Sequence, residues 1–368
     1  MRIGIIGAGQ LGQMLGFAAR GLGHECFFLD PSGDPPAAKA GPVVQAPFDD
    51  PVALSVLAEK VDVLTYEFEN VPVEALRGIA GGTPIYPPLE ALRLAQDRLD
   101  EKQLFERLDI PLPAYHVVDS AADLHAAADA IGLPLVVKTR RLGYDGKGQF
   151  VLRDKNQVAE AWQAIGTVPL IAEQWVPFDY EVSAIGVRGV DGQVAAYCLT
   201  HNEHAGGILR VSHAPVDDDR LTAKAHAYLS RMLEHLDYVG VLALELFVAG
   251  DALLANEFAP RVHNSGHWTI EGAATSQFAN HIRAVTGAAP GPVDTVGHAG
   301  MVNLIGTIPD SARHAAVGTL HDYGKSPRPG RKLGHITVVA ATGPERDAQT
   351  AVLTETVTQS STLNGTST

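Results

Sequence analysis

ALELFVAGDALLANEFAPRVHNSGHWT, residues 243–269, is the stretch that decides which fold this chain adopts. Two apolar runs of strand length, 242–248 and 252–258, stand on either side of Ala249-Gly250-Asp251. A Gly-Asp pair between two such runs is typical of a tight β-hairpin turn. The stretch therefore predicts a hairpin of two buried strands.

Each run carries one glutamate, Glu245 or Glu257, and both lie six positions from Asp251. A three-residue loop would pair them across the hairpin, and a two-residue loop would shift the register by one and still leave them close. Facing carboxylates in an apolar hairpin repel each other, and a hard cation such as Mg²⁺ removes that penalty. We therefore expect a metal site here, with one glutamate pointing to solvent at a strand edge as the alternative. The polar residues that follow would lie beside such a metal: Arg261, His263, Asn264 and His267.

The composition is that of a soluble globular protein. The chain has 368 residues, of which 46% are hydrophobic and 19% charged, enough for two or three domains with cores of their own. A net charge of −14 and the lack of a long basic run disfavour a nucleic-acid partner. Cys26 and Cys198 are too few for a disulfide framework or a metal site, and no apolar run reaches the ~18–20 residues of a membrane span. We expect a cytoplasmic protein with no membrane partner.

A glycine turn follows the first predicted strand. The strand is RIGIIG (2–7), the turn is GAGQLG (7–12), and a helical run and a second strand ending in Asp30 come next. This order matches the dinucleotide-binding fingerprint. Glycines at a helix N-terminus, however, only allow the backbone to approach a phosphate, without specifying which one. The pattern leaves three interpretations open: NAD, a substrate phosphate, or a purely structural turn.

Acidic residues stand at the end of the third predicted strand, 61–67. Glu67 and Glu69 lie at its carboxyl end, where open α/β sheets bind their ligands. A solvated loop before a helix fits this segment equally well.

A charged helix is predicted over 89–108. It contains Arg98 and Lys102, which lie one turn apart on the same face. Pro111 and Pro113 end this helix and mark a domain boundary.

Residues 135–153 predict a second hairpin whose tip is basic and rich in glycine. LVVK (135–138) puts Lys138 at the end of a strand, and RRLGYDGKG (140–148) joins it to a further strand. A flexible glycine tip can fold over a polyphosphate with its backbone N–H groups. It differs from a Walker A loop because a strand, not a helix, follows it. Phosphate cover is the favoured interpretation over a mobile surface hairpin.

The rest of the chain adds strands, two histidines, a basic loop and a tail. Strands are predicted over 169–176 and over 181–187, the second beginning at Glu181. His201 and His204 are interpreted, on sequence grounds alone, as ordinary hydrogen-bonded histidines. A basic Pro/Gly loop, 323–332, separates two short strands of a small third unit. The Thr- and Ser-rich tail after Thr342 has no apolar face and is expected to be frayed.

Together these pieces resemble the ATP-grasp superfamily, and within it the N5-carboxyaminoimidazole ribonucleotide synthetase family of de novo purine biosynthesis. The motifs that carry the resemblance, in chain order, are GAGQLG, DRLDEK, YDGKGQ, LTHNEH, NEFAPRVHNSGHWT and RPGRKLGH. The resemblance covers the chain to about residue 340. It implies a mixed α/β and α+β fold: a Rossmann-like N-terminal (preATP-grasp) domain over 1–100, an ATP-grasp domain with a two-part ATP clamp over 101–290, a small C-terminal domain over 298–342, and the frayed tail, 343–368.

The resemblance implies an ATP-dependent carbon–nitrogen ligase. ATP, bicarbonate and 5-aminoimidazole ribonucleotide would give ADP, phosphate and N5-carboxyaminoimidazole ribonucleotide, through carboxyphosphate or CO₂ released from it. Mg²⁺, with Mn²⁺ as the alternative, would be the metal, and bicarbonate the co-substrate. A homodimer is the assembly that the family implies.

The resemblance also implies roles for individual residues. Glu245 and Glu257 would bind the metal. The nucleotide would be held by Arg98, Lys138, the loop Gly143, Tyr144, Asp145, Gly146, Lys147, Gly148 and Gln149, the segment Glu173, Gln174, Trp175 and Val176, and by Glu181, His204, Asn256 and Glu257. The ribonucleotide would be bound by Gln10, Leu11, Glu69, Lys325 and Arg331. Bicarbonate and carboxyphosphate would meet Arg261, His263, Asn264, Tyr144 and Lys147.

Three other functions stay open at this point. An NAD-dependent oxidoreductase would use GAGQLG and Asp30, but it leaves the 138–149 loop and the two glutamates of the hairpin without a role. A non-catalytic nucleotide-sensing or scaffold module of the same fold is disfavoured because both glutamates, Lys138 and the glycine loop are present. Formate-dependent glycinamide ribonucleotide transformylase shares the N-terminal start, but RVHNSGHWT (261–269) favours the carboxylating enzyme.

Overall fold

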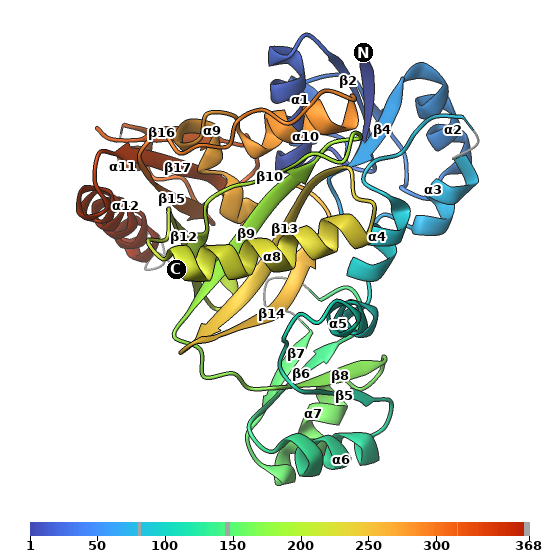
Figure 1. Cartoon of the computed structure of the whole chain (residues 1–368), viewed down its shortest axis with the longest axis vertical. Coiled ribbons are helices and arrows are strands. Elements are labelled where there is room, and N and C mark those ends of the chain that lie inside the picture. Colours follow the sequence, from blue (N-terminus) through green and yellow to red (C-terminus); the bar gives the residue numbers. More distant parts are fainter. Residues whose placement is uncertain (80–81, 144–147, 315, 364–368) are drawn as a thin grey trace.

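The computed structural model describes residues 1–79, 82–143, 148–314 and 316–363, with side chains as far as residue 357. The predicted loop residues Tyr144, Asp145, Gly146 and Lys147 lie outside these ranges. The N-terminal unit, a large central sheet and a small lower sheet follow one another in space, and the C-terminal elements extend the large sheet away from the N-terminus (Figure 1).

The N-terminal unit is a parallel sheet of order β3-β2-β1-β4 with helices against it. Ile3, Ile5 and Ile6 are fully buried in β1, as the run RIGIIG predicts for a strand covered on both faces. The elements are β1 (Arg2–Ile6), α1 (Gln10–Gly21), β2 (Glu25–Asp30), η1 (Pro36–Lys39), β3 (Val43–Gln45), α2 (Pro51–Lys60), β4 (Val63–Tyr66), α3 (Val73–Ile79) and α4 (Leu89–Ala95).

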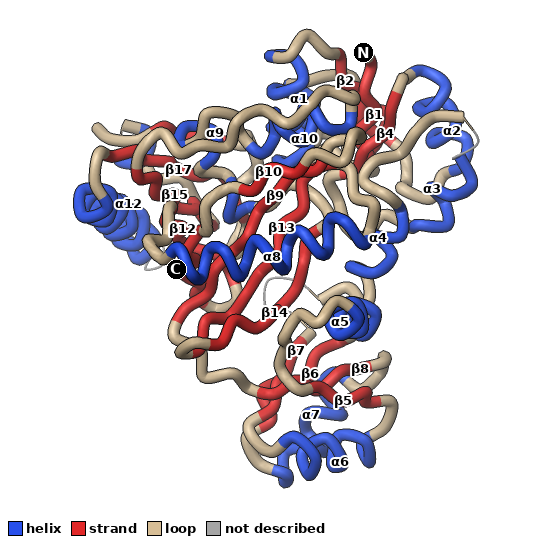
Figure 2. The backbone as a smooth tube through the Cα atoms, in the orientation of Figure 1, coloured by secondary structure: helices blue, strands red, loops and turns tan. Residues whose placement is uncertain are grey.

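A small antiparallel sheet of order β5-β8-β6-β7 forms the lower unit, with α6 and α7 on its outer side (Figures 1 and 2). The predicted hairpin is confirmed, because Lys138 of β6 is the register partner of Gln149 in β7. The elements are β5 (Tyr115–Val118), α6 (Ala121–Ile131), β6 (Leu135–Thr139), β7 (Gln149–Leu152), η2 (Lys155–Gln157), α7 (Val158–Ile165) and β8 (Leu170–Gln174).

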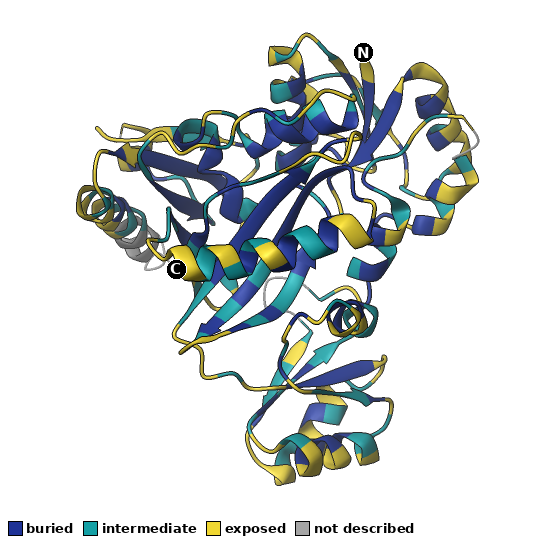
Figure 3. Ribbon diagram, in the orientation of Figure 1, coloured by how far each residue is buried: buried dark blue, intermediate teal, exposed yellow. Residues whose placement is uncertain are grey.

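The large sheet has the order β14-β13-β9-β11-β12-β15-β17-β16, with β10 paired to β9. Its central strands are the most buried part of the molecule (Figure 3). The strands are β9 (Tyr180–Arg188), β10 (Val194–Ala196), β11 (Thr200–Ala205), β12 (Ile208–Ala214), β13 (Gly240–Ala249), β14 (Ala252–Ala259), β15 (His298–Ile305), β16 (Thr319–Asp322) and β17 (Lys332–Ala340). The helices around it are α5 (Arg98–Arg107), α8 (Asp219–His235), η3 (Asn264–Gly266), α9 (Thr269–Gly272), α10 (Gln277–Val285), α11 (Asp310–Arg313) and α12 (Gly343–Leu363). The strands predicted for a small third unit are thus a continuation of this sheet, joined to it through β12 and β15.

The prediction of one helix over 89–108 is wrong. The helix is broken into α4 and α5, and Asp97 between them accepts a hydrogen bond from the backbone N–H of Leu99 (3.0 Å) as the N-cap of α5. An aspartate cap starts a new helix because its carboxylate satisfies a free backbone donor. Arg98 and Lys102 remain together on α5, at its first turns.

The expectation of a frayed tail after Thr342 is also wrong for the described residues. They form α12, which packs on β15 and β17 and buries Leu353 and Thr350 (each 2% exposed). Gly300 lets the helix lie close, because a Cβ at that position would stand 2.3 Å from the methyl group of Thr350. The sequence hid this helix because threonine supplies part of its buried face, so no apolar stripe marks it.

A buried histidine joins the N-terminal unit to the large sheet. The backbone N–H of Val241 in β13 donates to Nδ1 of His281 (3.1 Å), which leaves the Nε2–H to donate to the hydroxyl of Thr65 in β4 (2.9 Å). Burial lowers the pKa of His281 from 6.5 to about 4. The neutral ring is therefore the form that the folded protein requires.

This joint predicts acid sensitivity. Because the folded-state pKa is depressed, the contribution of His281 is complete above pH 6.5 and is lost as the pH falls towards about 4, at about 1.4 kcal/mol per pH unit. We expect His281→Gln to be less stable than the parent protein at pH 7.5 but to lose less stability between pH 7.5 and 5.5. Urea midpoints at the two pH values measure this, and equal losses in both proteins would contradict it.

Candidate active site

The two glutamates of the β13–β14 hairpin face each other, as predicted. The turn has two residues, since Ala249 pairs with Ala252, and a register shift after Glu245 then makes Glu245 and Glu257 Cα partners. The unmatched residue is Asn256, so a one-residue bulge in β14 restores the pairing that a two-residue turn alone would have shifted. Directly opposed residues of an antiparallel pair project from the same face of the sheet.

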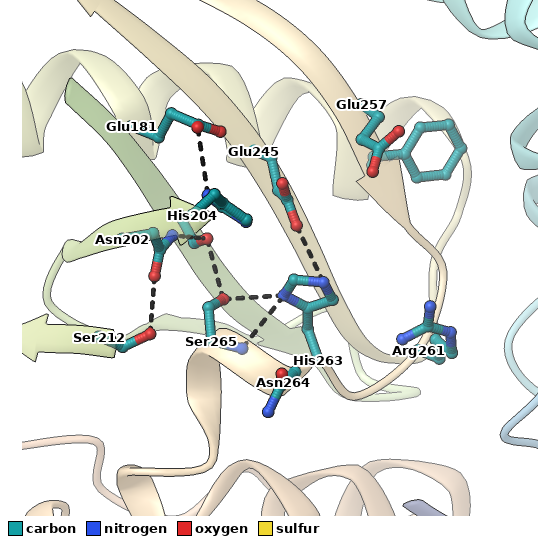
Figure 4. Close-up of polar contacts among 12 residues, drawn as sticks. Glu181, Asn202, His204, Ser212, Glu245, Glu257, Arg261, His263, Asn264 and Ser265 are labelled. Carbon is teal, nitrogen blue, oxygen red and sulfur yellow. Dashed lines mark hydrogen bonds and ion pairs between the residues drawn. The ribbon is translucent and has the colours of Figure 1, made fainter. Parts of the chain in front are cut away.

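Each of these glutamates has a nitrogen partner, and Figure 4 shows that of Glu245. Oε1 of Glu245 lies 2.9 Å from Nε2 of His263, and Oε2 of Glu257 accepts a hydrogen bond from Arg98 (2.9 Å). Burial alone would raise the pKa of Glu245, but His263, His204 and Lys332 outweigh it and hold the pKa well below its usual range. Glu245 is therefore a carboxylate at neutral pH.

A cavity of about 1210 Å³, continuous with solvent, opens over the hairpin. It collects side chains from the N-terminal unit, α5, the small sheet, the large sheet and the loop after β14. The predicted site residues that line it are Gln10, Leu11, Glu69, Arg98, Gly143, His204, Glu245, Glu257, Arg261, His263 and Asn264.

Two contacts at the edge of this cavity join residues that are far apart in the sequence. Arg261, just after β14, forms an ion pair with Glu69 of the N-terminal unit (2.5 Å). Lys325, from the basic loop before β17, donates to the side-chain oxygen of Gln10 at the start of α1. Three predicted substrate-binding residues thus meet at one side of the cavity although more than 300 residues separate two of them.

A row of polar side chains orients His263. Its Nδ1 lies 2.8 Å from the hydroxyl of Ser265, which donates to Ser183 of β9 (2.9 Å). Ser183 also accepts from Asn202 of β11 (2.7 Å), so the row crosses the sheet under the cavity (Figure 4). Because Nδ1 is engaged, Nε2 of His263 faces Glu245.

Glu181 and His204 lie beside the hairpin. Oε1 of Glu181 is 3.1 Å from Nδ1 of His204. Burial lowers the pKa of His204, but the contact with Glu181 and the charge of Glu245 outweigh it, and the net pKa is raised. One ligand atom from each of Glu181, His204 and Glu245 lies within 4.8 Å of the others. The sequence without the resemblance gave His204 no such role, whereas the resemblance assigned both Glu181 and His204 to the nucleotide.

A buried charge cluster lies between the small sheet and α5. Glu173 (2% exposed) binds Lys138 at 3.0 Å and the fully buried Lys102 at 3.3 Å. Burial would raise the pKa of Glu173, but these lysines and Arg98 hold it at about 2. Lys102 also donates to the backbone carbonyl of Asn256 in the bulge (2.7 Å), so α5 fixes the strand that carries Glu257. Among the described residues, Oε1 of Glu173 has no hydrogen-bond partner, which leaves one buried acceptor free.

The glycine turn at 7–12 is occupied by side chains of the protein itself. Asp30 accepts from the backbone N–H of Ala8 (2.8 Å), and Glu67 accepts from that of Gly9 (2.6 Å). A Cβ at Gly7, where φ is 101°, would meet Glu67 at 2.8 Å. Asp30 is therefore committed to the turn and not free for a ribose hydroxyl, and Glu67 fills the place that a dinucleotide phosphate would take.

Several predicted residues do not line the cavity. Gln174 ends β8, and Trp175 and Val176 follow it. Gly148 precedes β7 and Gln149 begins it, while Arg331 donates to the carbonyl of Ser326 in its own loop. The lining also lacks Lys138, Glu173, Glu181, Asn256 and Lys325, whose contacts are given above.

The structure adds residues that the sequence argument had not assigned to the site. Asp97 holds Arg140 through two hydrogen bonds (2.9 and 2.8 Å), which fixes the base of the glycine-rich tip against α5. Arg140, Glu101 and Lys332 line the cavity as well. The motif DRLDEK carried this signal, since it supplies Asp97, Arg98, Glu101 and Lys102 within one helix start.

Three known domain families match successive parts of the chain, and the second and third of them divide the large sheet between β14 and β15. The ribonucleotide synthetase preATP-grasp domain family matches residues 1–96, the ATP-grasp domain family residues 103–278, and the phosphoribosylaminoimidazole carboxylase C-terminal domain family residues 299–349. An N5-carboxyaminoimidazole ribonucleotide synthase of Pseudomonas aeruginosa is 51% identical over 343 residues, which make up 93% of this chain and 95% of the relative. The chain belongs to the N5-carboxyaminoimidazole ribonucleotide synthase family. The synthase of Brucella melitensis is 47% identical over 346 residues, 91% of this chain and 95% of the relative.

Solved structures of the synthase family agree with this assignment. The synthetase of Thermus thermophilus is 50% identical, with a TM-score of 0.92 over 96% of this chain and 98% of that one. An Aspergillus clavatus synthase in complex with ADP and 5-aminoimidazole ribonucleotide is 30% identical, with a TM-score of 0.90 over 97% of this chain and 98% of that one. The predicted family, the ATP-grasp fold and the class of ligase in purine biosynthesis are confirmed, and the NAD-dependent interpretation is wrong.

Proposed function

We propose that this enzyme carboxylates 5-aminoimidazole ribonucleotide with bicarbonate, at the expense of ATP and through carboxyphosphate. The observation that supports this most directly is the shared cavity, in which Gln10 and Glu69 of the N-terminal unit stand opposite Glu245, Glu257 and the loop after β14. One cavity can thus hold the nucleotide, the anhydride and the amine together. Such proximity matters because carboxyphosphate is labile in water.

We propose Mg²⁺, or Mn²⁺ in its place, between Glu245 and Glu257. The residues fit such an ion, since both glutamates project from one face of the hairpin into the cavity and offer only oxygen ligands. When bound, the ion would neutralise charge on the transferred phosphoryl group.

The nucleotide lies, in this proposal, between the small and the large sheet. Arg98 and Lys138 neutralise phosphate charge. At the ribose, Glu181 accepts hydrogen bonds and His204 donates one. The free buried oxygen of Glu173 is an acceptor placed next to these cations. Gly143 to Gln149 are assigned to the phosphates, and Tyr144 and Lys147 to bicarbonate.

Bicarbonate and carboxyphosphate are assigned to the loop after β14. Arg261 provides a fixed cation whose pKa is held above its ordinary value, because the Glu69 carboxylate outweighs the effect of burial. Asn264 is fixed by two hydrogen bonds with Asn303 of β15 (3.1 and 2.8 Å). His263 is the group of this set that can accept a proton, since imidazole is a general base. Preorganised donors of this kind stabilise charge that develops in the transition state.

The ribonucleotide phosphate is assigned to the start of α1. Gln10 and Leu11 form its first helical turn, where backbone N–H groups attract an anion. Lys325 and Arg331 supply positive charge from the loop before β17, and Glu69 is a further contact for the substrate.

Release of ADP tests the proposed function. It should require both bicarbonate and 5-aminoimidazole ribonucleotide for full rate, and formate with glycinamide ribonucleotide should not replace them. Full ADP release without bicarbonate would refute the proposal.

The charge of Lys325 predicts a pH dependence of substrate binding. Burial lowers the pKa of Lys325 to about 8, with Arg331 acting in the same direction and Glu67 against it. The ammonium is present below this pH and lost above it, so we expect the KM for the ribonucleotide to rise up to about tenfold per pH unit above 8. Lys325→Arg should flatten the rise because guanidinium stays charged. KM measured from pH 7 to 9 checks this, and an equal rise in the variant would contradict it.

We further propose that the enzyme is a cytoplasmic homodimer. The described helices include none with the length and apolarity to cross a membrane. Sedimentation equilibrium tests the assembly, and a single species at the 38.9 kDa of one chain would refute it.

A further inference from the structure

The C-terminal strands present a row of polar side chains to the segment that follows β14. His335 of β17 is the register partner of Asn303 in β15 and of His321 in β16. Directly opposed residues of antiparallel strands project from the same face of a sheet, and α9 packs against β15 and β17 (Figure 1). Asn303 holds Asn264 through the two hydrogen bonds given above. The row therefore begins at a residue assigned to carboxyphosphate.

Three histidine rings continue this row. The ring of His335 stacks on that of His321, with centroids 4.5 Å apart, and its centroid lies 4.9 Å from that of His267. His321 is bound to Glu271 of α9 (2.6 Å). Burial lowers the pKa of His267 and of His335 well below 6.5, so both rings are neutral at pH 7 and pack without repelling each other. The stack thus joins the segment after β14 to the C-terminal strands.

Tyr323 connects this stack to the basic loop, 323–332. Its side chain is buried, and its hydroxyl shares a hydrogen bond with Nδ1 of His335 (2.8 Å). Among the residues that the structure describes, Nε2 of His335 has no hydrogen-bond partner, so the bond to Tyr323 orients the ring. The backbone N–H of Tyr323 donates to the carbonyl of Leu333 (2.9 Å) and closes the loop at its base.

The loop turns directly after Tyr323 and brings Lys325 over its ring. Gly324 has a φ of 72°, which favours glycine, and its backbone N–H donates to Oδ1 of Asp322 (2.8 Å). Nζ of Lys325 lies 5.9 Å from the centroid of the Tyr323 ring, within the range in which an aromatic face attracts an ammonium. The same ammonium donates to Gln10. Tyr323 therefore supports the cation at the start of α1.

We propose that Tyr323 is a positioning residue for the ribonucleotide: held by His335, it sets the place of Lys325. The proposal rests on the proposed function, in which Lys325 binds the ribonucleotide phosphate. Tyr323 does not line the active-site cavity, so it acts through Lys325 and not by touching the substrate. Because the row that ends at Tyr323 also holds Asn264, the contacts assigned to the phosphate and to carboxyphosphate are kept in fixed relation.

Tyr323→Phe removes the hydroxyl and keeps the ring. We expect the KM for the ribonucleotide to rise about five- to tenfold, the effect of one lost hydrogen bond, while kcat and the KM for ATP stay within about twofold of the parent values. Tyr115→Phe is the matched control, since it removes a tyrosine hydroxyl that bonds Glu106 (3.0 Å) far from the basic loop. It should leave the KM for the ribonucleotide unchanged. ADP release at saturating ATP and bicarbonate measures all of these.

Lys325→Met in both backgrounds shows whether Tyr323 acts through Lys325. If it does, the double variant should have the KM of Lys325→Met within about twofold, because the cation to be positioned is already gone. An additive rise in the double variant, an unaltered KM in Tyr323→Phe, or an equal rise in the KM for ATP would overturn the proposal. The parent protein in the same assay tests the proposed function separately: ADP release that does not depend on the ribonucleotide would refute both.

A second pair of variants tests the same bond from the side of His335. His335→Asn keeps a hydrogen-bonding group near the position of Nδ1, and His335→Leu does not. The KM for the ribonucleotide should therefore be lower in His335→Asn than in His335→Leu, and equal values would count against the positioning role. Circular dichroism and thermal midpoints check that each variant folds.

Discussion

Glu245→Gln is expected to lower the rate of ADP release by about 10³-fold or more, which corresponds to about 4 kcal/mol in the barrier. The amide keeps the shape of the side chain but removes the charge that would hold the divalent ion, and a metal ion stabilises phosphoryl transfer by several kcal/mol. Glu257→Gln should act in the same direction because the two carboxylates form one cross-strand pair. The loss of turnover in Glu257→Gln has a second cause, because Arg98 loses its charged partner.

The measurement has two parts. Coupled ADP release gives turnover, and Mn²⁺ titration followed by electron paramagnetic resonance gives metal affinity with nucleotide present. Glu234→Gln, on the exposed side of α8, is the matched control and should leave both unchanged. Unaltered Mn²⁺ affinity in both Glu245→Gln and Glu257→Gln would rule out the assigned ligands.

Arg261→Ala is expected to lower turnover by about 10²-fold or more while leaving nucleotide affinity nearly unchanged. The guanidinium lies in the loop after β14, and its ion pair is with Glu69, which is not assigned to the nucleotide. Its loss removes a fixed donor for charge on carboxyphosphate. Fluorescent nucleotide binding and single-turnover ADP release separate the two quantities.

Glu69→Gln is the control that separates anion binding from packing. It removes the same ion pair but keeps the guanidinium, so turnover at saturating ribonucleotide, where a lost substrate contact of Glu69 no longer counts, should fall far less than in Arg261→Ala. Equal losses in the two variants would mean that Arg261 acts by holding the N-terminal unit in place, and normal turnover in Arg261→Ala would remove it from the mechanism.

The hairpin was predictable because its evidence is local. Two strand-length runs, a Gly-Asp turn and two equidistant glutamates suffice to pair Glu245 with Glu257. The bulge at Asn256 was not predictable, because it is fixed by Lys102, which lies 154 residues away in the chain. The loop length and the register were each ambiguous until this contact was known.

The predictions that were wrong also failed because of contacts between residues far apart in the chain. The break between α4 and α5 follows from Asp97, whose carboxylate also binds Arg140 in the loop after β6. Helix α12 is stabilised by a close approach to Gly300, which its own threonine-rich sequence does not signal. The glycine turn looked open to a dinucleotide because the residue that fills it, Glu67, comes from another strand. Periodicity in the sequence predicts single helices and strands. Contacts between side chains of different elements can be known only from the folded structure.

A crystal structure with Mn²⁺ and a non-hydrolysable ATP analogue tests the central claim most directly. The account predicts an anomalous peak for Mn²⁺ bound by oxygens of both Glu245 and Glu257, with the triphosphate between the large and the small sheet. A peak bound by Glu181 and His204 without Glu257, or the ATP analogue bound at residues 7–12, would contradict it.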